Sequence, residues 1–324
     1  MEEARSETPA MRKCAVVGIV GRTNSGKSSL INQMVGEKVS IVSPVQQTTR
    51  NTIRAILTED RGQLVFRDTP GLHKAESTLG TLMNRMARAA SAGTDVLCVV
   101  FDASKMPQLE DDGWMRRVVH EESAVVFVLN KADRFRTSGD GKADAKSPET
   151  VQKFHELWRQ IQEEKKSDKA VTWIETCALT PKGVQPLLDK LFELALPSEE
   201  LLFPEDIVTD YPRKLAISDV IREKFLQRLH DEVPHELGIK IDQIEESPKK
   251  WDVNVTIYVN RPSQKFIVIG TKARTLKFVR ERAEPELSDM FGVQVRLYLW
   301  VKIERDWMKN FWLLREMGYA GSLQ

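Results

Sequence analysis

The first residues whose types and spacing could do chemistry run from Gly21 to Ser28, with the sequence GRTNSGKS. They match the pattern G-x-x-x-x-G-K-[ST], and they stand between an apolar run and a stretch with helical periodicity. The glycines let the backbone N–H groups converge on phosphate oxygens at a helix N-terminus. We expect Lys27 to reach the β and γ phosphates and the Ser28 hydroxyl to ligate Mg²⁺. The loop predicts a nucleoside triphosphate site made by Gly21, Arg22, Thr23, Asn24, Ser25, Gly26, Lys27 and Ser28.

A second motif follows the apolar run QLVFR and reads Asp68-Thr69-Pro70-Gly71. Asp68 can orient Mg²⁺ through water, and Gly71 can offer its N–H to the γ-phosphate. Leu72 completes this predicted part of the site. A Ras-like enzyme would carry a water-orienting glutamine here, so hydrolysis is expected to be slow. His73 is either a base or an incidental loop histidine, and the sequence leaves both open.

Two further motifs narrow the nucleotide to GTP. Asn130-Lys131-Ala132-Asp133 follows the run VVFVL, and a carboxylate there can accept both N–H groups of the guanine edge, which adenine lacks. The aliphatic stem of Lys131 can lie along the base. Cys177-Ala178-Leu179, after WIET, can place backbone N–H groups near the guanine oxygen. All motifs follow strand-like runs in the chain order of a GTPase.

Between the first two motifs lies VQQTTRNTI, in the position of a GTPase switch segment. A threonine in such a segment completes the Mg²⁺ coordination when the γ-phosphate is present. Thr48 and Thr49 are the candidates, and we favour Thr49. The predicted metal ligands are therefore Ser28, Thr49 and Asp68.

The elements that must hold these motifs alternate between apolar, β-branched runs and helical stretches. Short, nearly continuous apolar runs are typical of strands buried on both faces of a parallel sheet. We predict a doubly wound, mostly parallel α/β domain over residues 13–197 after a disordered tail over 1–12. Residues 134–149 are polar, rich in Gly, Ser and Lys, and lack periodicity. They are interpreted as a surface insertion.

Two prolines, Pro204 and Pro212, lie in a predicted linker over residues 198–212, and Pro197 stands just before it. Residues 213–324 then change pattern, with strands that alternate in polarity and two helices that flank Gly270. We predict a small α+β domain with an antiparallel sheet, covered by helices on one side, and a C-terminal tail.

Bulk properties exclude some classes of protein. The net charge is +1, so any basic surface must be local. No apolar run is long enough to span a bilayer, and the polar first ten residues do not resemble a signal peptide. The three cysteines are interpreted as reduced thiols of a cytoplasmic protein. Whether Met1 or Met11 is the true start stays open.

Together GRTNSGKSSLINQMVG, QQTTRN, DTPGLHK, NKAD and the CAL turn resemble the Era family of GTPases. After the linker, IYVNRPSQKFIVIGTKA and LYLWVKIERDWMKNFWLLREMGY resemble the type II KH domain of that family. The likeness runs from about Lys13 to Tyr319. It departs from the usual GRPNVGKS at Thr23 and Ser25, which changes loop stiffness and no phosphate contact. The Der type of GTPase, with two tandem GTPase domains, fits less well because this chain has one set of motifs.

The resemblance implies a GTPase that binds the 3′ end region of 16S ribosomal RNA and assists assembly of the small (30S) ribosomal subunit. It also implies a monomer that associates peripherally with the inner face of the cell membrane. In potassium-dependent relatives, the asparagine that matches Asn24 helps to bind a monovalent cation. By analogy Asn24 would let K⁺ supply positive charge beside the phosphates. The implied catalytic set is Lys27, Asn24, Thr49 and Gly71.

A KH domain clamps RNA with a G-x-x-G loop, and this chain has Ala273 in place of the second glycine. From Arg261 to Arg282 there are seven Lys or Arg residues and one acid, Glu281. We favour RNA binding over a merely solvated basic helix, with an apolar floor from Ile267, Val268 and Ile269. The terminal aromatics Trp300, Trp307, Trp312 and Tyr319 are interpreted as packing residues. The predicted RNA-binding residues are Lys265, Ile269, Gly270, Thr271, Lys272, Ala273, Arg274, Lys277 and Arg280.

A rival interpretation is a scaffold with a structural GTP site and a protein-docking C-terminal domain. It predicts negligible turnover and no preference for RNA. The intact Lys27, Asp68 and Asp133 argue against it, and Ala273 argues slightly for it.

Overall fold

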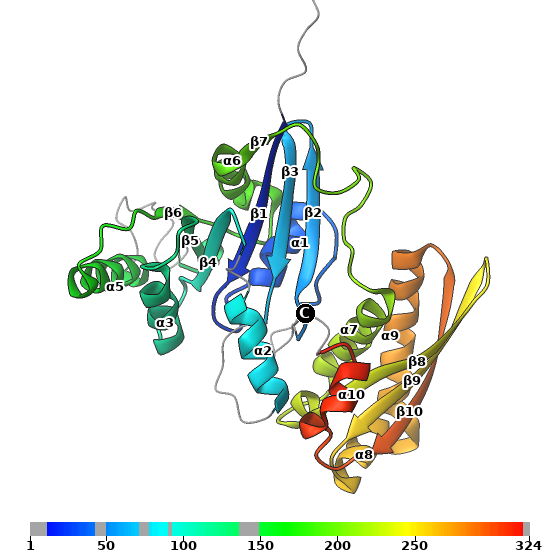
Figure 1. Cartoon of the computed structure of the whole chain (residues 1–324). Coiled ribbons are helices and arrows are strands. Elements are labelled where there is room, and N and C mark those ends of the chain that lie inside the picture. The colour runs from blue at the N-terminus through cyan, green and yellow to red at the C-terminus, as the bar shows by residue number, and fades with distance from the viewer. Residues whose placement is uncertain (1–11, 43–49, 71–77, 90–92, 136–148, 320–324) are drawn as a thin grey trace, which may run out of the picture.

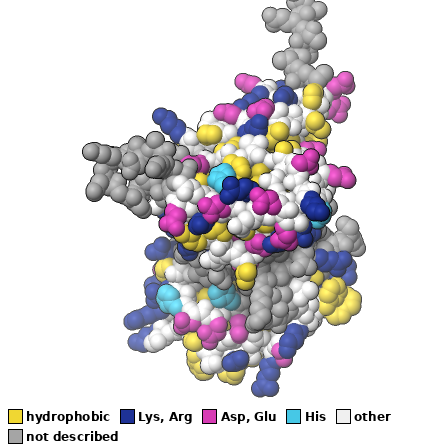
Figure 2. All heavy atoms as spheres, turned by 90° about the vertical axis from the view of Figure 1, so that its left-hand side faces the viewer, with side chains coloured by type: hydrophobic (Ala, Val, Ile, Leu, Met, Phe, Trp, Pro, Cys, Tyr) yellow, Lys and Arg dark blue, Asp and Glu magenta, His cyan; other side chains and the backbone are white. Residues whose placement is uncertain are grey.

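The computed structural model describes residues 12–42, 50–70, 78–89, 93–135 and 149–319. These residues form two β-sheets with their own helices, which lie side by side (Figure 1). We call the part from β1 (Arg12–Val20) to β7 (Leu196–Ser198) the N-terminal domain and the part from α7 (Arg213–Arg228) to α10 (Phe311–Glu316) the C-terminal domain. Seen from the side of α3 (Leu109–Val118) and α5 (Glu149–Lys165), Lys, Arg, Asp and Glu side chains are interspersed over the surface (Figure 2). That pattern agrees with the near-zero net charge.

The N-terminal domain holds a seven-stranded sheet in the order β2-β3-β1-β4-β5-β6, with β7 paired to the start of β1. β1, β3, β4, β5 and β6 run parallel, and β2 pairs antiparallel with β3. Its strands are β1 (Arg12–Val20), β2 (Ile53–Glu59), β3 (Gly62–Asp68), β4 (Val96–Asp102), β5 (Ala124–Asn130), β6 (Thr172–Glu175) and β7 (Leu196–Ser198). Its helices are α1 (Lys27–Val35), α2 (Thr78–Ala89), α3 (Leu109–Val118), α4 (Ala132–Phe135), α5 (Glu149–Lys165), the 3-10 turn η1 (Pro181–Gly183) and α6 (Gln185–Leu194). The predicted doubly wound fold is confirmed.

Both faces of this sheet are covered, which explains why the central strands are apolar throughout. On one face α1 and α6 pack over residues such as Val17 and Val100. On the other face α3 and α5 pack over Leu97 and Phe127. Because parallel strands all end at one edge, the motifs that follow β1, β3, β5 and β6 meet there.

The C-terminal domain holds a three-stranded sheet in the order β10-β9-β8. Its elements are α7 (Arg213–Arg228), η2 (Val233–Glu236), β8 (Gly238–Glu246), β9 (Lys250–Val259), α8 (Pro262–Ile269), η3 (Thr271–Ala273), α9 (Arg274–Phe291), β10 (Gln294–Ile303), η4 (Trp307–Lys309) and α10 (Phe311–Glu316). The α+β class is confirmed, and the fully antiparallel sheet was wrong. β9 pairs antiparallel with β8 but parallel with β10, because α8 and α9 carry the chain back across the sheet before β10 begins.

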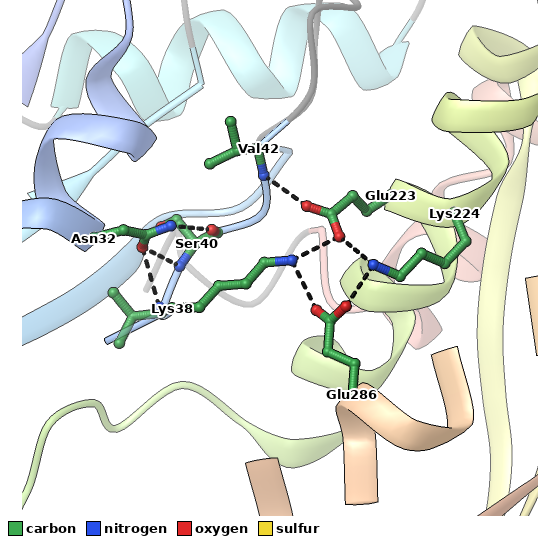
Figure 3. Close-up of polar contacts among 8 residues, drawn as sticks. Asn32, Lys38, Ser40, Val42, Glu223, Lys224 and Glu286 are labelled. Atoms are coloured by element: carbon green, nitrogen blue, oxygen red, sulfur yellow. Dashed lines mark hydrogen bonds and ion pairs between the residues drawn. The ribbon is translucent and has the colours of Figure 1, made fainter. Parts of the chain in front are cut away.

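Charged side chains join the two domains through α7 and α9 (Figure 3). Lys38 Nζ lies 2.7 Å from carboxylate oxygens of both Glu223 and Glu286. Lys224 Nζ donates to the same two carboxylates. The backbone N–H of Val42 donates to Glu223 Oε1 at 3.0 Å. The residue just before segment 43–49 is thus hydrogen-bonded to the second domain.

The residue just after that segment is bound there as well. Arg50 is buried, and its guanidinium donates to the carbonyl oxygens of Leu237 and His235, each at 2.7 Å. Asn51 Nδ2 donates to the hydroxyl of Tyr211 at 3.2 Å. Both ends of the segment that holds Thr48 and Thr49 are therefore held by residues beyond β7.

An apolar contact adds to this interface. Leu79 and Met83 of α2 are buried in one cluster with Trp307, Leu314 and Met317 of the C-terminal domain. α2 begins directly after residues 71–77, which include Gly71 of the second nucleotide motif. Among the described residues, no helix combines the length and the apolar character that crossing a bilayer requires.

Candidate functional site

The loop between β1 and α1 has a backbone that its sequence explains. Gly21 has φ 147° and Gly26 has φ 98°, in the range that favours glycine. A Cβ on Gly26 would lie 2.3 Å from Asn130 Nδ2. The second glycine of the motif is thus required both by its backbone angle and by the neighbouring Asn130.

Lys27 and Asp68 face each other across this loop as buried charges. Lys27 Nζ donates to the carbonyl oxygens of Gly21 at 3.2 Å and Arg22 at 2.9 Å. Burial lowers the pKa of Lys27 to about 8 and raises the pKa of Asp68. Both pKa shifts mean that burial makes the charged forms of Lys27 and Asp68 less favourable. Such a pair suits a site that receives a phosphate and a cation.

Two of the three predicted Mg²⁺ ligands, Ser28 and Asp68, lie among the described residues. Ser28 Oγ donates to Asp68 Oδ2 at 2.8 Å, so the two predicted ligands meet. Asp68 Oδ1 is buried and makes no hydrogen bond to another described residue. A hydroxyl and a carboxylate are the oxygen ligands that Mg²⁺ uses beside phosphates. The residues present therefore fit Mg²⁺.

Hydrogen bonds connect the two predicted guanine-binding motifs to the phosphate-binding loop. Asn130 Nδ2 donates to the carbonyl oxygen of Ser25 at 3.0 Å, and Thr176 Oγ1 donates to Asn130 Oδ1 at 3.1 Å. Cys177 Sγ lies 3.4 Å from Asp133 Oδ1. Three loops, which follow β1, β5 and β6, are thereby joined around one position. The carboxylate of Asp133 is half-buried there.

Two acids in the site were missed from the sequence. Lys131 Nζ donates to Asn24 O and to Asp102 Oδ2, each at 2.7 Å. Arg22 is buried, with its Nε 3.3 Å from Asp111 and its Nη2 3.7 Å from Asp102. Burial raises the pKa of Asp111 to about 6. Burial opposes the charge of Asp102 too, but hydrogen bonds from Lys131 and Ser104 leave its pKa lowered.

The sequence contains a pattern that could have predicted one of these two acids, Asp102, as a site residue. Asp102 ends the apolar run DVLCVVFD just as Asp68 and Asn130 end theirs, so strand ends predict it. Asp111 resembles any acid in the first turn of a helix, and only the fold brings it to Arg22.

The other predicted nucleotide residues divide into two sets. The Thr69 hydroxyl donates to Ile19 O at 3.1 Å, Pro70 is buried, and Leu179 is 73% exposed. Thr23 and Ala178 are half-buried, and Ala132 N donates to Thr176 O at 3.0 Å. The remaining residues, Thr48, Thr49, Gly71, Leu72 and His73, lie outside the described residues.

The turn between α8 and α9 departs from an ordinary helical connection. Gly270 has φ 75° and ψ 162°, a region essentially reserved for glycine, and a Cβ there would lie 2.4 Å from Thr275 Oγ1. Lys272 and Ala273 have φ 51° and 57°, which are costly for residues with a Cβ. Ala273 thus adopts the left-handed backbone that glycine would adopt freely.

A groove of about 420 Å³ lies between this turn, α9 and β10. Four of the predicted RNA-binding residues line it, namely Lys272, Ala273, Lys277 and Arg280. Lys265, Ile269, Gly270, Thr271 and Arg274 lie beside it on the turn and the flanking helices. The predicted apolar floor was wrong at Val268, which is fully buried in the core, whereas Ile267 is 49% exposed and Ile269 is half-buried. The apolar lining comes from Leu276, Leu297 and Leu299.

Of the four aromatic residues near the C-terminus that were predicted to pack, two are buried and two are exposed. Trp307 and Tyr319 are buried, as predicted for packing residues. Trp300 is 68% exposed and Trp312 is 69% exposed, so the packing interpretation was wrong for both. Trp300 and Tyr298 lie at the groove.

Family models match both halves of the chain. The model described as a 50S ribosome-binding GTPase matches residues 16–131, and the KH domain model matches residues 232–308. GTPase Era of Rippkaea orientalis is 37% identical over 313 residues, which cover 95% of this chain and 92% of that protein. This chain belongs to the GTPase Era family. GTPase Era of Carboxydothermus hydrogenoformans is 36% identical over 95% of this chain and 98% of its own length.

Solved Era structures extend the likeness over both domains. Aquifex aeolicus Era bound to GDP and AlF₄⁻ is 31% identical, with a TM-score of 0.82 over 95% of this chain and 99% of that chain. Era in complex with MgGDPNP and nucleotides 1506–1542 of 16S ribosomal RNA gives the same identity, TM-score and coverage. As a member of the Era family, the chain is a GTPase with a C-terminal KH domain.

Proposed function

We propose that this GTPase binds the 3′ end region of 16S ribosomal RNA through its KH domain, in a way that its nucleotide state controls, and so assists assembly of the 30S subunit. The observation that carries the proposal is that the chain on both sides of segment 43–49 is bound to the KH domain. A relative that binds nucleotides 1506–1542 of 16S ribosomal RNA supports the choice of RNA.

In the nucleotide half, the backbone of Gly21 to Ser28 cradles the phosphates, and Lys27 lies along them. Asn130 holds the loops together, and Asp133 accepts the guanine N–H pair, with Cys177, Ala178 and Leu179 beside the guanine oxygen. Ser28, Asp68 and Thr49 would hold Mg²⁺, and Gly71 would donate to the γ-phosphate. Bound Mg²⁺ neutralises phosphate charge. Asp111 and Asp102 fix Arg22 and Lys131 behind the loop.

The role of Asn24 stays a hypothesis. Its side chain is exposed at the tip of the loop, with φ 60°, and its carbonyl oxygen is held by Lys131. If Asn24 helps to bind K⁺, hydrolysis in KCl exceeds hydrolysis in NaCl at equal ionic strength, and Asn24→Ala removes the difference. Equal rates in both salts would refute this role.

In the RNA half, phosphates meet the exposed ammonium and guanidinium groups of Lys272, Lys277 and Arg280. The left-handed backbone at Lys272 and Ala273 keeps the turn open to the backbone of the RNA. We retain residues 13–197 and 213–324 as domain limits, with 134–149 as an insertion and 198–212 as a linker. A cytoplasmic monomer that associates peripherally with the inner membrane face also stays a prediction.

Control by nucleotide follows from how the switch segments are attached. Any rearrangement of segment 43–49 on loss of the γ-phosphate would pull on Val42 and Arg50, and so on Glu223, His235 and Leu237. Glu286 belongs to α9, the same helix that begins with the RNA-binding residues. The charge cluster of Lys38, Glu223, Lys224 and Glu286 thereby connects the first switch to the RNA groove.

The test measures binding of RNA 1506–1542 with GDP and with a non-hydrolysable GTP analogue, at two salt concentrations. We expect selective binding over a scrambled RNA and at least a tenfold difference between the nucleotides. Glu223→Gln should shrink that difference, because an amide cannot pair with Lys38 and Lys224. Glu246→Gln is the matched control, since Glu246 pairs with Arg213 on the surface of the KH domain, at 3.3 Å.

One outcome would reject the proposal, and another would reject only the route by which the nucleotide acts. Equal, weak and purely salt-dependent binding in both states would favour the scaffold with a protein-docking C-terminal domain. A large nucleotide effect that survives in Glu223→Gln would reject the route through the charge cluster.

A further inference from the structure

The edge strand β10 carries a regular row of exposed side chains, and the aromatic ones also line the RNA groove. Its outward positions are Arg296, Tyr298, Trp300 and Lys302, all exposed. The intervening Val295 and Leu297 are buried against the helices. β10 is the end strand in the order β10-β9-β8, so this row stands beside an open edge of the sheet. Two aromatic rings are thus bracketed by two cations along one strand.

We propose that Tyr298 and Trp300 form a stacking platform for unpaired nucleobases of the RNA strand that leaves the KH groove. The inference rests on the proposed function and adds a site to it. The G-x-x-G-like turn holds phosphates, whereas this platform holds base faces. Its ligand is a single-stranded ribonucleotide segment, one or two bases long, directly next to the nucleotides in the groove.

The position of Trp300 is the first reason. Trp300 and Tyr298 line the same groove as Lys272, Lys277 and Arg280. Their side chains lie on the outward face of the strand, and those of Leu297 and Leu299 lie on the helix side. An RNA strand that crosses the edge of β10 passes from the basic helix directly to the two rings.

The exposure of the rings is the second reason. Trp300 is 68% exposed and Tyr298 is 45% exposed, so neither ring contributes its full area to the core. The Tyr298 hydroxyl donates to Asp252 Oδ1 at 3.2 Å, which fixes the orientation of that ring. Exposed aromatic rings beside a positively charged groove are the arrangement that binds single strands. Each base has a π-face, so such a platform tolerates different sequences.

The charges around the platform agree with a strand of phosphates. Arg296 and Lys302 are exposed on either side of the rings. Three acids also lie on this face, and each is engaged: Asp252 by Lys250 at 2.6 Å, Glu304 by Lys302 at 3.3 Å, and Asp242 by the hydroxyl of Thr256 at 2.7 Å. Phosphates can therefore approach from the Arg296 side without meeting one of these carboxylates unpaired.

Trp312 provides a matched control within the same domain. It is 69% exposed, like Trp300, but it lies on α10 with Phe311, whose ring centroid is 6.0 Å away. Arg315 lies 6.0 Å from its ring. Trp312 does not line the groove. The two tryptophans thus differ in place and not in chemistry or exposure.

The experiment compares Trp300→Ala, Trp300→Phe, Trp312→Ala and the wild-type protein for binding of RNA 1506–1542. We expect Trp300→Ala to lose about tenfold in affinity, Trp300→Phe to keep most of it, and Trp312→Ala to match wild type. A second readout uses RNAs that carry 2-aminopurine at single unpaired adenines. Stacking quenches its fluorescence, and the quenching should disappear in Trp300→Ala alone. Thermal unfolding should be unchanged, because the ring is exposed.

Each result distinguishes the two proposals. If wild type binds the RNA and Trp300→Ala binds it equally, with the quenching intact, the platform is refuted and the proposed function stands. If Trp312→Ala weakens binding as much as Trp300→Ala, the effect is not specific to the groove and the platform is again refuted. If wild type shows no preference for this RNA, the proposed function fails and this inference fails with it.

Discussion

The nucleotide pocket and the RNA groove are built from charged side chains in opposite ways. In the pocket, Lys27, Asp68 and Asn130 are buried, and each is hydrogen-bonded to a residue between Gly21 and Ser28. In the groove, Lys272, Lys277 and Arg280 reach into solvent from one turn and one helix. The pocket must select one base and one chain of phosphates, which requires preorganised contacts. The groove must meet a flexible strand, whose phosphates attract any suitably placed cation.

The difference has an energetic consequence. Burial lowers the pKa of Lys27 and raises those of Asp68 and Asp111, so keeping these groups charged in the folded protein costs stability. Exposed ion pairs at the groove contribute little either way. Substitutions in the pocket should therefore change activity and stability strongly and separately. Substitutions in the groove should change the affinity for RNA modestly, and they should change how steeply that affinity depends on salt concentration.

The largest expected effect is that of Lys27→Ala. Removing the ammonium from the phosphates should lower the rate of GTP hydrolysis by about 10³-fold, because a preorganised charge is lost from the transition state. Single-turnover hydrolysis measures this loss. Lys153→Ala, on the surface helix α5, is the control and should hydrolyse GTP like wild type. RNA affinity without nucleotide should stay unchanged. A parallel loss of RNA affinity would show that the two regions are not separable.

A smaller effect concerns stability and the buried Asp111. Its pKa is about 6 in the folded state against 3.8 in the unfolded state, so the native state binds the proton more tightly. The stabilising contribution is therefore present at low pH and is lost as the pH rises through about 6. Relative to Asp111→Asn, wild type should lose about 2 kcal/mol of unfolding free energy between pH 4.5 and 7.5, as 1.5 pKa units imply.

Urea unfolding of the nucleotide-free proteins at the two pH values measures this change. Asp112→Asn is the matched control, because it removes the neighbouring carboxyl, which reaches solvent and pairs with Arg116. A difference between wild type and Asp111→Asn that is the same at both pH values would contradict a perturbed buried carboxyl beside Arg22.

The contrast between the two regions also explains what the sequence could predict. Motifs such as GRTNSGKS and NKAD combine fixed spacing with the apolar runs before them, and strand ends meet at one edge of a parallel sheet. Ser28 and Asp68 therefore lie within hydrogen-bonding distance, and Lys27 is close enough to Asp68 for their charges to interact. Asp111 was missed because its partner Arg22 is remote in sequence, and no local spacing connects a helix start with the phosphate loop.

The RNA groove was predicted less completely for a related reason. Its cations follow one another along α9, so the sequence predicted Lys277 and Arg280. Its apolar wall comes from β10, and the direction of β10 beside β9 depends on the crossover through two helices. An alternating strand does not reveal which of its faces lies next to a groove. Val268 was consequently placed in the floor, and Trp300 was left out.

The smallest expected effect is that of Lys277→Ala on RNA binding. Lys277 is 66% exposed in its side chain and pairs with Glu281 at 3.6 Å, so its loss should leave stability unchanged. Affinity for RNA 1506–1542 should fall about threefold at 0.15 M salt, and the slope of log affinity against log salt should decrease by about one, as for one lost phosphate contact. Lys153→Ala again serves as the control, since it removes an exposed lysine paired with a helical glutamate far from the groove. A loss of affinity with an unchanged salt slope would mean that Lys277 shapes the groove instead of meeting a phosphate. The RNA region would then share the preorganised character of the nucleotide pocket, and the contrast between the two regions would disappear.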